Sequence, residues 1–276
     1  MPTDARRLIR KMRGGAQAHL LEAADGHAYV VKFVNNPQHR RILINEWIAS
    51  TFLNYLGIAT PAAAMIRISD DFLTANPEVH LQLGKRHELP QPGWHFGSRF
   101  PGSPMTNTVY DFLPDGILGT IENLSDFLGA LAFDKWMGNA DARQSIFFRA
   151  RLKEWIPEAH GLKMGYVAQM IDNGYVFGGP HWQFTDSAIQ GLYFRPHVYK
   201  NVRSLADFDP WLSRIVNFPE EIVDQAVKSI PPAWLAGDED ALEVLLARLM
   251  KRRARVPDLI ENSRGGMINL FPNWRG

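Results

Sequence analysis

The chain has 276 residues, of which 46% are apolar and 21% charged, so it can bury a sizeable core and is not globally disordered. Lys and Arg number 30 against 29 Asp and Glu, and a net charge of +1 provides no overall basic field for binding nucleic acid. The absence of cysteine excludes disulfides, thiolate chemistry and cysteine-ligated zinc. The chain shows neither a signal-peptide pattern nor an apolar run approaching 18 residues, so we expect a cytoplasmic protein without a membrane span.

Residues 17–33 predict a β-hairpin. Asp25-Gly26 is a strong turn pair between an apolar-rich stretch and the β-branched and aromatic residues 29–33. Alternate side chains of a strand face opposite sides, so Lys32 should point away from the side of Val31 and Phe33.

A helix with marked ends follows the hairpin. Asn36 is a candidate N-cap, Pro37 fits the first helical position, and Gly57 fits the position after the C-terminus. Glu46 lies beside the apolar face of this helix, directly after the strand that carries Lys32.

The next segments predict further strands and a hinge. Residues 58–69, 79–83 and 94–100 have strand patterns, and residues 101–120 are rich in Pro, Gly and Thr. We therefore expect an N-terminal lobe of residues 1–105, with a small antiparallel sheet and one helix, and a cleft near residues 101–120.

The remainder, residues 106–276, predicts a larger and mainly helical lobe. A helix over residues 124–137, capped by Asn123, should end at Gly138, and strands should cover residues 145–148 and 166–171. Residues 205–262 read as helices broken at prolines 210, 219, 231 and 232. The expected fold class is α+β with two lobes.

Residues that can bind phosphate, bind a metal ion or orient an acceptor follow one another in a meaningful order along these two lobes. The turn Arg13-Gly14-Gly15-Ala16-Gln17 allows backbone N–H groups to approach phosphate oxygens. Lys32 supplies a cation that can reach the same phosphates, and Glu46 can hold that cation in place. Asp141 and Asp172 follow in polar loops at strand edges, which suits a hydroxyl-orienting base and a Mg²⁺ ligand.

This order matches the protein-kinase-like fold, and its details resemble the HipA-like kinases. Gly15-Ala16-Gln17 resembles the family's phosphate loop, residues 30–33 its lysine strand and Asn45-Glu46 its helix partner. Residues 138–144 resemble the catalytic loop, and Asp172-Asn173-Gly174 the metal-binding loop. The resemblance covers roughly residues 13–260, and we expect the compact HipA-like branch, without the extra N-terminal subdomain of longer HipA toxins.

The resemblance implies an ATP- and Mg²⁺-dependent phosphotransferase, of the Ser/Thr protein kinase type. ATP phosphates would lie under residues 14–17 (Gly14, Gly15, Ala16 and Gln17) and touch Lys32, which Glu46 holds. Asp172 would bind Mg²⁺ with help from Gln144. Asp141 would orient the acceptor hydroxyl, and Arg143 could neutralise phosphate charge. The acceptor would be a protein or a small molecule, and an antitoxin-like partner is possible.

Departures from the family pattern leave other readings open. The Asn expected five positions after Asp141 is Ile146, so Gln144 or Asn139 would have to substitute as a metal ligand. A pseudokinase is therefore the main alternative, followed by a small-molecule kinase similar to aminoglycoside phosphotransferases and by transfer of AMP. The basic residues 251–253 favour an interaction with a helix C-terminus over a nucleic-acid site. Residues 177–182 fit an activation-type segment or an ordinary loop.

Overall fold

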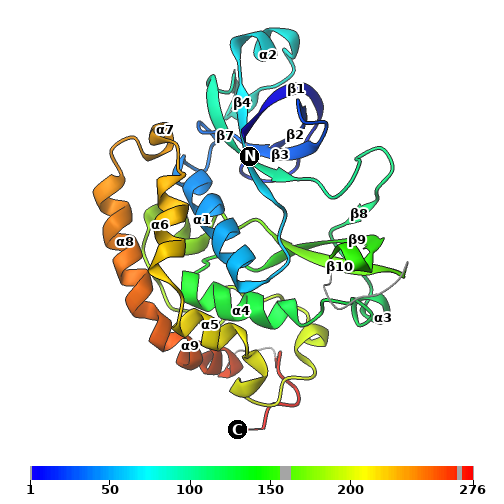
Figure 1. The fold of residues 1–276 in the computed structure, drawn as a ribbon, viewed down its shortest axis with the longest axis vertical. Helices are drawn as coiled ribbons and strands as arrows, with labels where there is room; N and C mark the ends of the chain where they lie inside the picture. The colour runs from blue at the N-terminus through cyan, green and yellow to red at the C-terminus, as the bar shows by residue number, and fades with distance from the viewer. Residues whose placement is uncertain (1, 156–162, 266–268, 276) are drawn as a thin grey trace.

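Five strands of the first hundred residues close into a barrel in the computed structural model, which describes residues 2–155, 163–265 and 269–275 (Figure 1). They are β1 (Pro2–Lys11), β2 (His19–Ala23), β3 (Ala28–Lys32), β4 (Ala63–Ile68) and β7 (Gly93–Arg99), in the order β1-β2-β3-β7-β4. The predicted small antiparallel sheet is thus a closed barrel with four antiparallel pairings, because β1, which had no strand prediction, also pairs in parallel with β4.

The hairpin of β2 and β3 is confirmed. Glu22 pairs with Ala28 across it, and Asp25 accepts hydrogen bonds from the His27 N–H (3.0 Å) and the Tyr29 hydroxyl (2.7 Å). Val31 and Phe33 pack into the core of the barrel, so Lys32 between them faces the opposite side, as expected.

Short elements cover the outside of the barrel. They are α2 (Asp70–Ala75) and the hairpin of β5 (Leu81–Leu83) and β6 (Arg86–Glu88). Of these, only β5 was predicted, within residues 79–83.

Helix α1 (Arg41–Leu56) ends as predicted but begins later. Gly57 lies in the left-handed region at φ 73° and its N–H donates to the Asn54 carbonyl (3.1 Å). The predicted start at Asn36 is wrong, because the Asn36 side chain instead bonds the carbonyls of Phe33 (2.8 Å) and His39 (3.1 Å) and forms a turn.

The predicted central helix is α4 (Asp126–Met137), which stops at Gly138 as expected. Asn123 is not its cap: its side chain donates to Asp126 Oδ2 (2.8 Å) and to the Ala168 carbonyl (2.9 Å), and accepts from the Ala168 N–H (2.9 Å). Asn123 thereby joins the start of the helix to a neighbouring strand.

A three-stranded sheet accompanies the helices of the C-terminal part, in the order β10-β9-β8. Its strands are β8 (Val109–Tyr110), β9 (Gln144–Arg151) and β10 (Met164–Ile171). The two predicted strands are confirmed and extend further than predicted, and β8 together with α3 (Asp115–Leu118) lies in the expected hinge segment.

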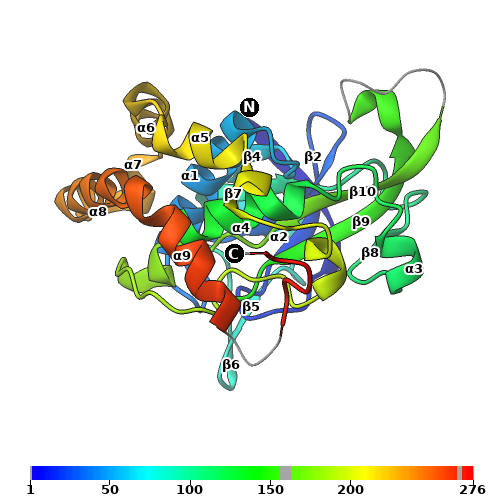
Figure 2. The same ribbon diagram turned by 90° about the horizontal axis from the view of Figure 1, so that it is seen from below.

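The last third is helical, with breaks at the predicted prolines. The helices are α5 (Trp211–Val216), α6 (Glu220–Lys228), α7 (Pro232–Leu235), α8 (Glu239–Arg252) and α9 (Val256–Asn262). Short 3₁₀ turns are η1 (Leu152–Glu154), η2 (Val176–His181), η3 (Pro196–Tyr199), η4 (Leu205–Phe208), η5 (Arg253–Arg255) and η6 (Ser263–Gly265). In the view from below, α5 to α8 lie on one side of α4 and the β8–β10 sheet with α3 on the other (Figure 2).

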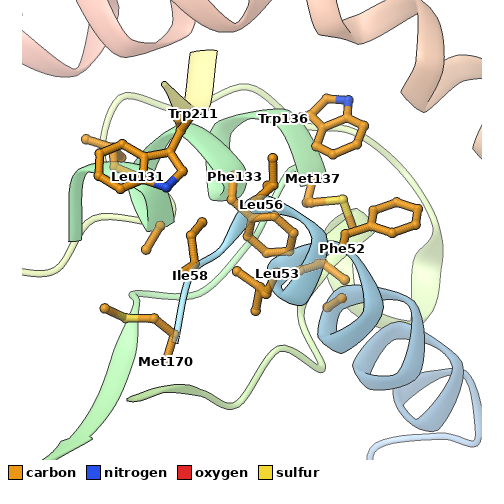
Figure 3. Close-up of a cluster of buried hydrophobic side chains, with 14 of the residues drawn as sticks. Phe52, Leu53, Leu56, Ile58, Leu131, Phe133, Trp136, Met137, Met170 and Trp211 are labelled. Carbon is orange, nitrogen blue, oxygen red and sulfur yellow. The ribbon is translucent and has the colours of Figure 1, made fainter. Parts of the chain in front are cut away.

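The largest core joins α1 to the C-terminal helices. Phe52 of α1 is fully buried and stacks on Trp136 of α4, with ring centroids 5.5 Å apart (Figure 3). Phe218 packs against both rings at 4.7 Å. The interior of the barrel forms a separate cluster of buried side chains around Val31 and Ile66.

Within the described parts of the chain, no helix combines the length and the apolar character that a membrane crossing requires.

Candidate active site

A cavity of about 560 Å³ lies between the barrel and the sheet of β9 and β10. The predicted site residues in its lining are Gly14, Gly15, Ala16, Gln17, Lys32, Glu46, Gln144 and Asp172. Pro101, Val109 and Asp111 also line it, so the cleft lies beside the segment where it was predicted. The fold thus brings together residues from the start, the middle and the second half of the chain.

Lys32 lies at the bottom of this cavity between two carboxylates. Its Nζ donates to Glu46 Oε1 at 2.5 Å, as predicted, and to Asp172 Oδ1 at 2.6 Å. Burial alone would lower the pKa of the Lys32 ammonium, but the charges of Glu46 and Asp172 outweigh it and raise that pKa well above its usual range. Lys32 is therefore a permanent cation at the cavity.

Asn45, the residue before Glu46, fixes the segment that follows Asp172. Its side-chain amide donates to three backbone carbonyls of that segment, those of Gly174 (2.7 Å), Val176 (3.1 Å) and Gly179 (3.1 Å). Its Oδ1 accepts from Trp182 Nε1 at 2.9 Å. Neighbouring residues of α1 thus hold both Lys32 and the loop of Asp172. No sequence signal indicated this second role, because its partners lie about 130 residues away.

Asp172 and Gln144 lie together at the mouth of the cavity. Asp172 has a left-handed backbone at φ 57°, and its Oδ2 accepts from Gln144 Nε2 at 3.2 Å. The Lys32 ammonium holds the pKa of the Asp172 carboxyl below its usual range, so the carboxylate stays ionised. The Asp172 side chain is 39% exposed, which leaves it accessible to a ligand.

These two residues fit a metal ion that arrives with a nucleotide. No cluster of three or more His, Asp or Glu side chains suited to a metal occurs in the described ranges. Mg²⁺ commonly binds through one or two protein oxygens and takes its other ligands from phosphates and water. The other predicted candidate, Asn139, is buried and donates to Asp134 Oδ1 (3.0 Å), away from the cavity.

The catalytic-loop candidate Asp141 is exposed and its backbone is fixed. Its N–H donates to Asn139 Oδ1 (3.1 Å) and its carbonyl accepts from the Gly191 N–H (2.9 Å). Its Oδ1 accepts from the Ala142 N–H at 2.7 Å. Asp141 lies just outside the cavity lining, three residues before Gln144, where an acceptor could approach from solvent.

Arg143 has a geometry that does not fit the predicted contact with phosphate. Its side chain is 1% exposed and forms two hydrogen bonds with the carboxylate of Asp134, one of them from Nε at 2.7 Å. Its Nη1 donates to the Ile171 carbonyl (3.0 Å) and to Asn173 Oδ1 (2.8 Å). Arg143 therefore links α4, the catalytic loop and the loop after β10 from beneath the site.

The glycine turn is exposed, and Gln17 anchors it. Gly14 has φ 121°, a backbone conformation that a residue with a Cβ adopts only with strain. The Gln17 side chain pairs with the main chain of Gln82 in β5: Nε2 donates to the carbonyl (2.7 Å) and Oε1 accepts from the N–H (2.6 Å). Gln17 thus secures the turn to the β5–β6 hairpin, a partner that the local sequence does not indicate.

The basic cluster near residue 252 binds helix ends, as predicted: Arg253 Nε donates to the Met250 carbonyl of its own helix (2.8 Å), and Arg252 bonds the end of α4. Arg252 Nε donates to the carbonyls of Lys135 (3.2 Å) and Trp136 (3.0 Å). Arg252 and Arg255 also form ion pairs with Asp186. Residues 177–181 lie in η2, and Trp182 follows it. Asn45 bonds this segment as described above.

Comparisons with known proteins identify a family and a fold. A family model described as "HipA-like kinase" matches residues 6–147. Similar solved structures include that of hydra Fam20 with sugar, with 14% identity, a TM-score of 0.53, and coverage of 95% of this chain and 85% of that one.

Two structures of the Golgi casein kinase are also similar. The one with Mn/ADP bound has 11% identity, a TM-score of 0.52 and coverage of 95% of this chain and 74% of its own. The other has 12% identity, a TM-score of 0.53 and coverage of 96% and 74%. At these identities the likeness shows a kinase-like fold. No curated protein matches the chain.

Proposed function

The chain belongs to the HipA-like kinase family, and from that premise we propose that it is an ATP- and Mg²⁺-dependent phosphotransferase that acts on a Ser or Thr hydroxyl of a protein. The observation that carries this proposal is the placement of Lys32 Nζ between Glu46 (2.5 Å) and Asp172 (2.6 Å) in a cavity roofed by the glycine turn. A fixed cation, an ionised carboxylate and exposed backbone beside one another suit a polyphosphate with its metal ion.

Each residue has a distinct part in the proposed reaction. Residues 14–17 cover the ATP phosphates, Lys32 neutralises their charge, and Glu46 keeps Lys32 extended. Asp172, helped by Gln144, would hold the Mg²⁺, which would supply charge neutralisation on the phosphates. Glu46 and Lys32 act through position and charge alone, as is general for phosphoryl transfer.

Asp141 completes the proposed site as the residue that orients the acceptor. It accepts the hydroxyl proton while the acceptor oxygen bonds to the γ-phosphorus and the bond from that phosphorus to the β–γ bridging oxygen breaks, which releases ADP. Arg143 serves as a positioning residue in this proposal, because its guanidinium is fully engaged below the loop.

A pseudokinase remains the second candidate because of Ile146. This residue lines the cavity at the position where the family pattern supplies a second metal ligand, and an aliphatic side chain cannot bind a metal ion. Gln144 is the polar side chain beside Asp172 that can compensate. In this alternative the protein binds nucleotide without transfer. The cytoplasmic location and an antitoxin-like partner stay predictions.

Substitution of Asp141 by Ala tests the proposal. We expect transfer of the labelled γ-phosphate of ATP to lysate proteins or to the chain itself to fall by at least about 100-fold, while ATP affinity stays within about twofold. Asp224→Ala, which changes an exposed aspartate of α6, is the matched control and should leave both unchanged. ATP binding by the wild-type chain without any ADP or labelled product would contradict the proposal and favour the pseudokinase. Release of pyrophosphate would indicate transfer of AMP.

A further inference from the structure

The segment of residues 187–192 is bonded to the catalytic loop at Asp141 and at Arg143. The Gly191 N–H donates to the Asp141 carbonyl (2.9 Å), and the Arg143 N–H donates to the Leu192 carbonyl (3.1 Å). Gly191 has φ 71°, and a Cβ there would lie 2.4 Å from the Asp134 Cβ, so the segment runs directly against α4. The backbone position of Asp141 therefore depends on where this segment lies.

Lys135 of α4 holds the same segment from below. Its Nζ donates to three backbone carbonyls, those of Ser187 (3.0 Å), Ala188 (3.0 Å) and Gln190 (2.8 Å). An ammonium has three protons, so these bonds use its full donor capacity. Lys135 is 4% exposed and forms no ion pair within the parts of the chain that the structure describes.

A buried ammonium bonded only to carbonyls is a costly arrangement. Removing a cation from water is unfavourable, and carbonyl dipoles compensate for it less than a carboxylate does. An apolar side chain would fill the same space without this cost. The arrangement is accounted for if the three bonds are needed to give the segment one fixed conformation.

We propose that Lys135 is a positioning residue for the catalytic loop: its ammonium fixes residues 187–190, and the chain that continues from them holds the loop backbone at Asp141 and Arg143. The consequence for catalysis rests on the phosphotransferase proposed above, whereas the effect on the loop does not.

Lys135 loses its proton more easily than an exposed lysine. Burial lowers the pKa of Lys135 to about 8, Arg252 adds to this lowering, and Asp134 and Asp186 partly offset it. The unfolded chain holds the proton up to the usual pKa of 10.5, so this group makes the free energy of unfolding rise, not fall, from pH 8 to 10.5. The same linkage applies to any opening that exposes Lys135 to water, so alkaline pH does not by itself release the segment.

Hydrogen exchange of two backbone amides tests the positioning role directly. In Lys135→Met, the Gly191 and Arg143 amides should lose at least about tenfold of their protection at pH 7, since each bond then depends on a mobile segment. Lys251→Met, at an exposed lysine of α8, is the control and should not change them. If the variant does not fold, Lys135→Gln, whose amide can donate to at most two of the three carbonyls, gives the same comparison, with the Val31 amide of the barrel as the internal reference. Unchanged protection at both amides overturns the proposal.

Activity supplies the second measurement. ADP release from Mg²⁺-ATP should fall about 10- to 100-fold in Lys135→Met with the affinity for ATP unchanged, because displacement of a reacting group by about 1 Å has costs of that size. Weaker protection with full activity overturns the catalytic consequence. Weaker protection in a chain that never releases ADP supports the positioning role and contradicts the proposed phosphotransferase.

Discussion

Arg143 shows how far the position of a residue in a motif can predict its role. Its place two residues after Asp141 suggested a cation for the phosphates, but its guanidinium points beneath the loop to Asp134, which is fully buried. Asp134 lies nine residues earlier on α4, and no local pattern marks the two as partners. In contrast, the Lys32–Glu46 contact could be predicted, because strand alternation and the following helix place both on the same side.

Removal of Arg143 should destabilise the protein more than it affects nucleotide binding. Arg143→Met leaves the buried Asp134 carboxylate without its cation, and we expect the free energy of unfolding to fall by about 3–5 kcal/mol. Urea denaturation measures this, with Arg149→Met on the exposed side of β9 as the control. A variant with unchanged stability and a raised KM for ATP would instead show that Arg143 contacts phosphate.

At the scale of elements, helix ends were predicted better than helix starts. Gly57 and Gly138 each follow the last residue of a helix and have a left-handed backbone. Glycine adopts this conformation without strain, so the local sequence is enough to predict where the helix ends. Asn36 and Asn123 were expected to cap helices, but their amides bond a turn and a strand instead. An asparagine can satisfy any nearby backbone group, so tertiary contacts decide which one it bonds.

Strand β1, which closes the barrel, could not be predicted from the local sequence either. It is rich in arginine, and only Ala5 in it is buried, so the alternation that identifies a half-buried strand is absent. Its partners are β2, the next strand in sequence, and β4, some sixty residues away. The closed barrel follows from the second, long-range pairing.

The anchoring of the glycine turn to β5 leads to a prediction about nucleotide affinity. Gln17→Ala removes two hydrogen bonds to Gln82, worth about 1–3 kcal/mol together, and so makes the turn more mobile. We expect the KM for ATP to rise several-fold with kcat changed less than twofold, because in the proposed function the turn contacts the phosphates whereas Asp141 and Asp172 stay in place. Steady-state ADP release at varied ATP measures both, with the exposed Gln225→Ala of α6 as the control. A lower kcat with unchanged KM would contradict this role for the turn.

At the scale of the whole molecule, the two largest clusters of buried side chains do not follow the domain boundary that the sequence predicts. The predicted boundary between residues 105 and 106 follows composition, and it assigns α1 to the N-terminal lobe. The side chains of α1, however, pack in the large core with α4, α5 and α6, where the rings of Phe52, Trp136 and Phe218 all contact one another. Helix α1 therefore belongs to the C-terminal core by packing, while Glu46 on it serves the Lys32 strand of the barrel.

This sharing predicts that residues 106–276 do not fold alone. The fragment lacks Phe52, Ile48 and the other buried residues of α1, so its helices would expose an apolar face that the complete chain covers. Loss of one large buried side chain typically costs 3–5 kcal/mol, and loss of the helix removes several, which exceeds the usual stability of a domain. We expect the fragment to show no cooperative thermal transition and to aggregate, whereas the full chain unfolds cooperatively in calorimetry. A fragment with a sharp transition of its own would instead establish residue 106 as the start of an autonomous domain.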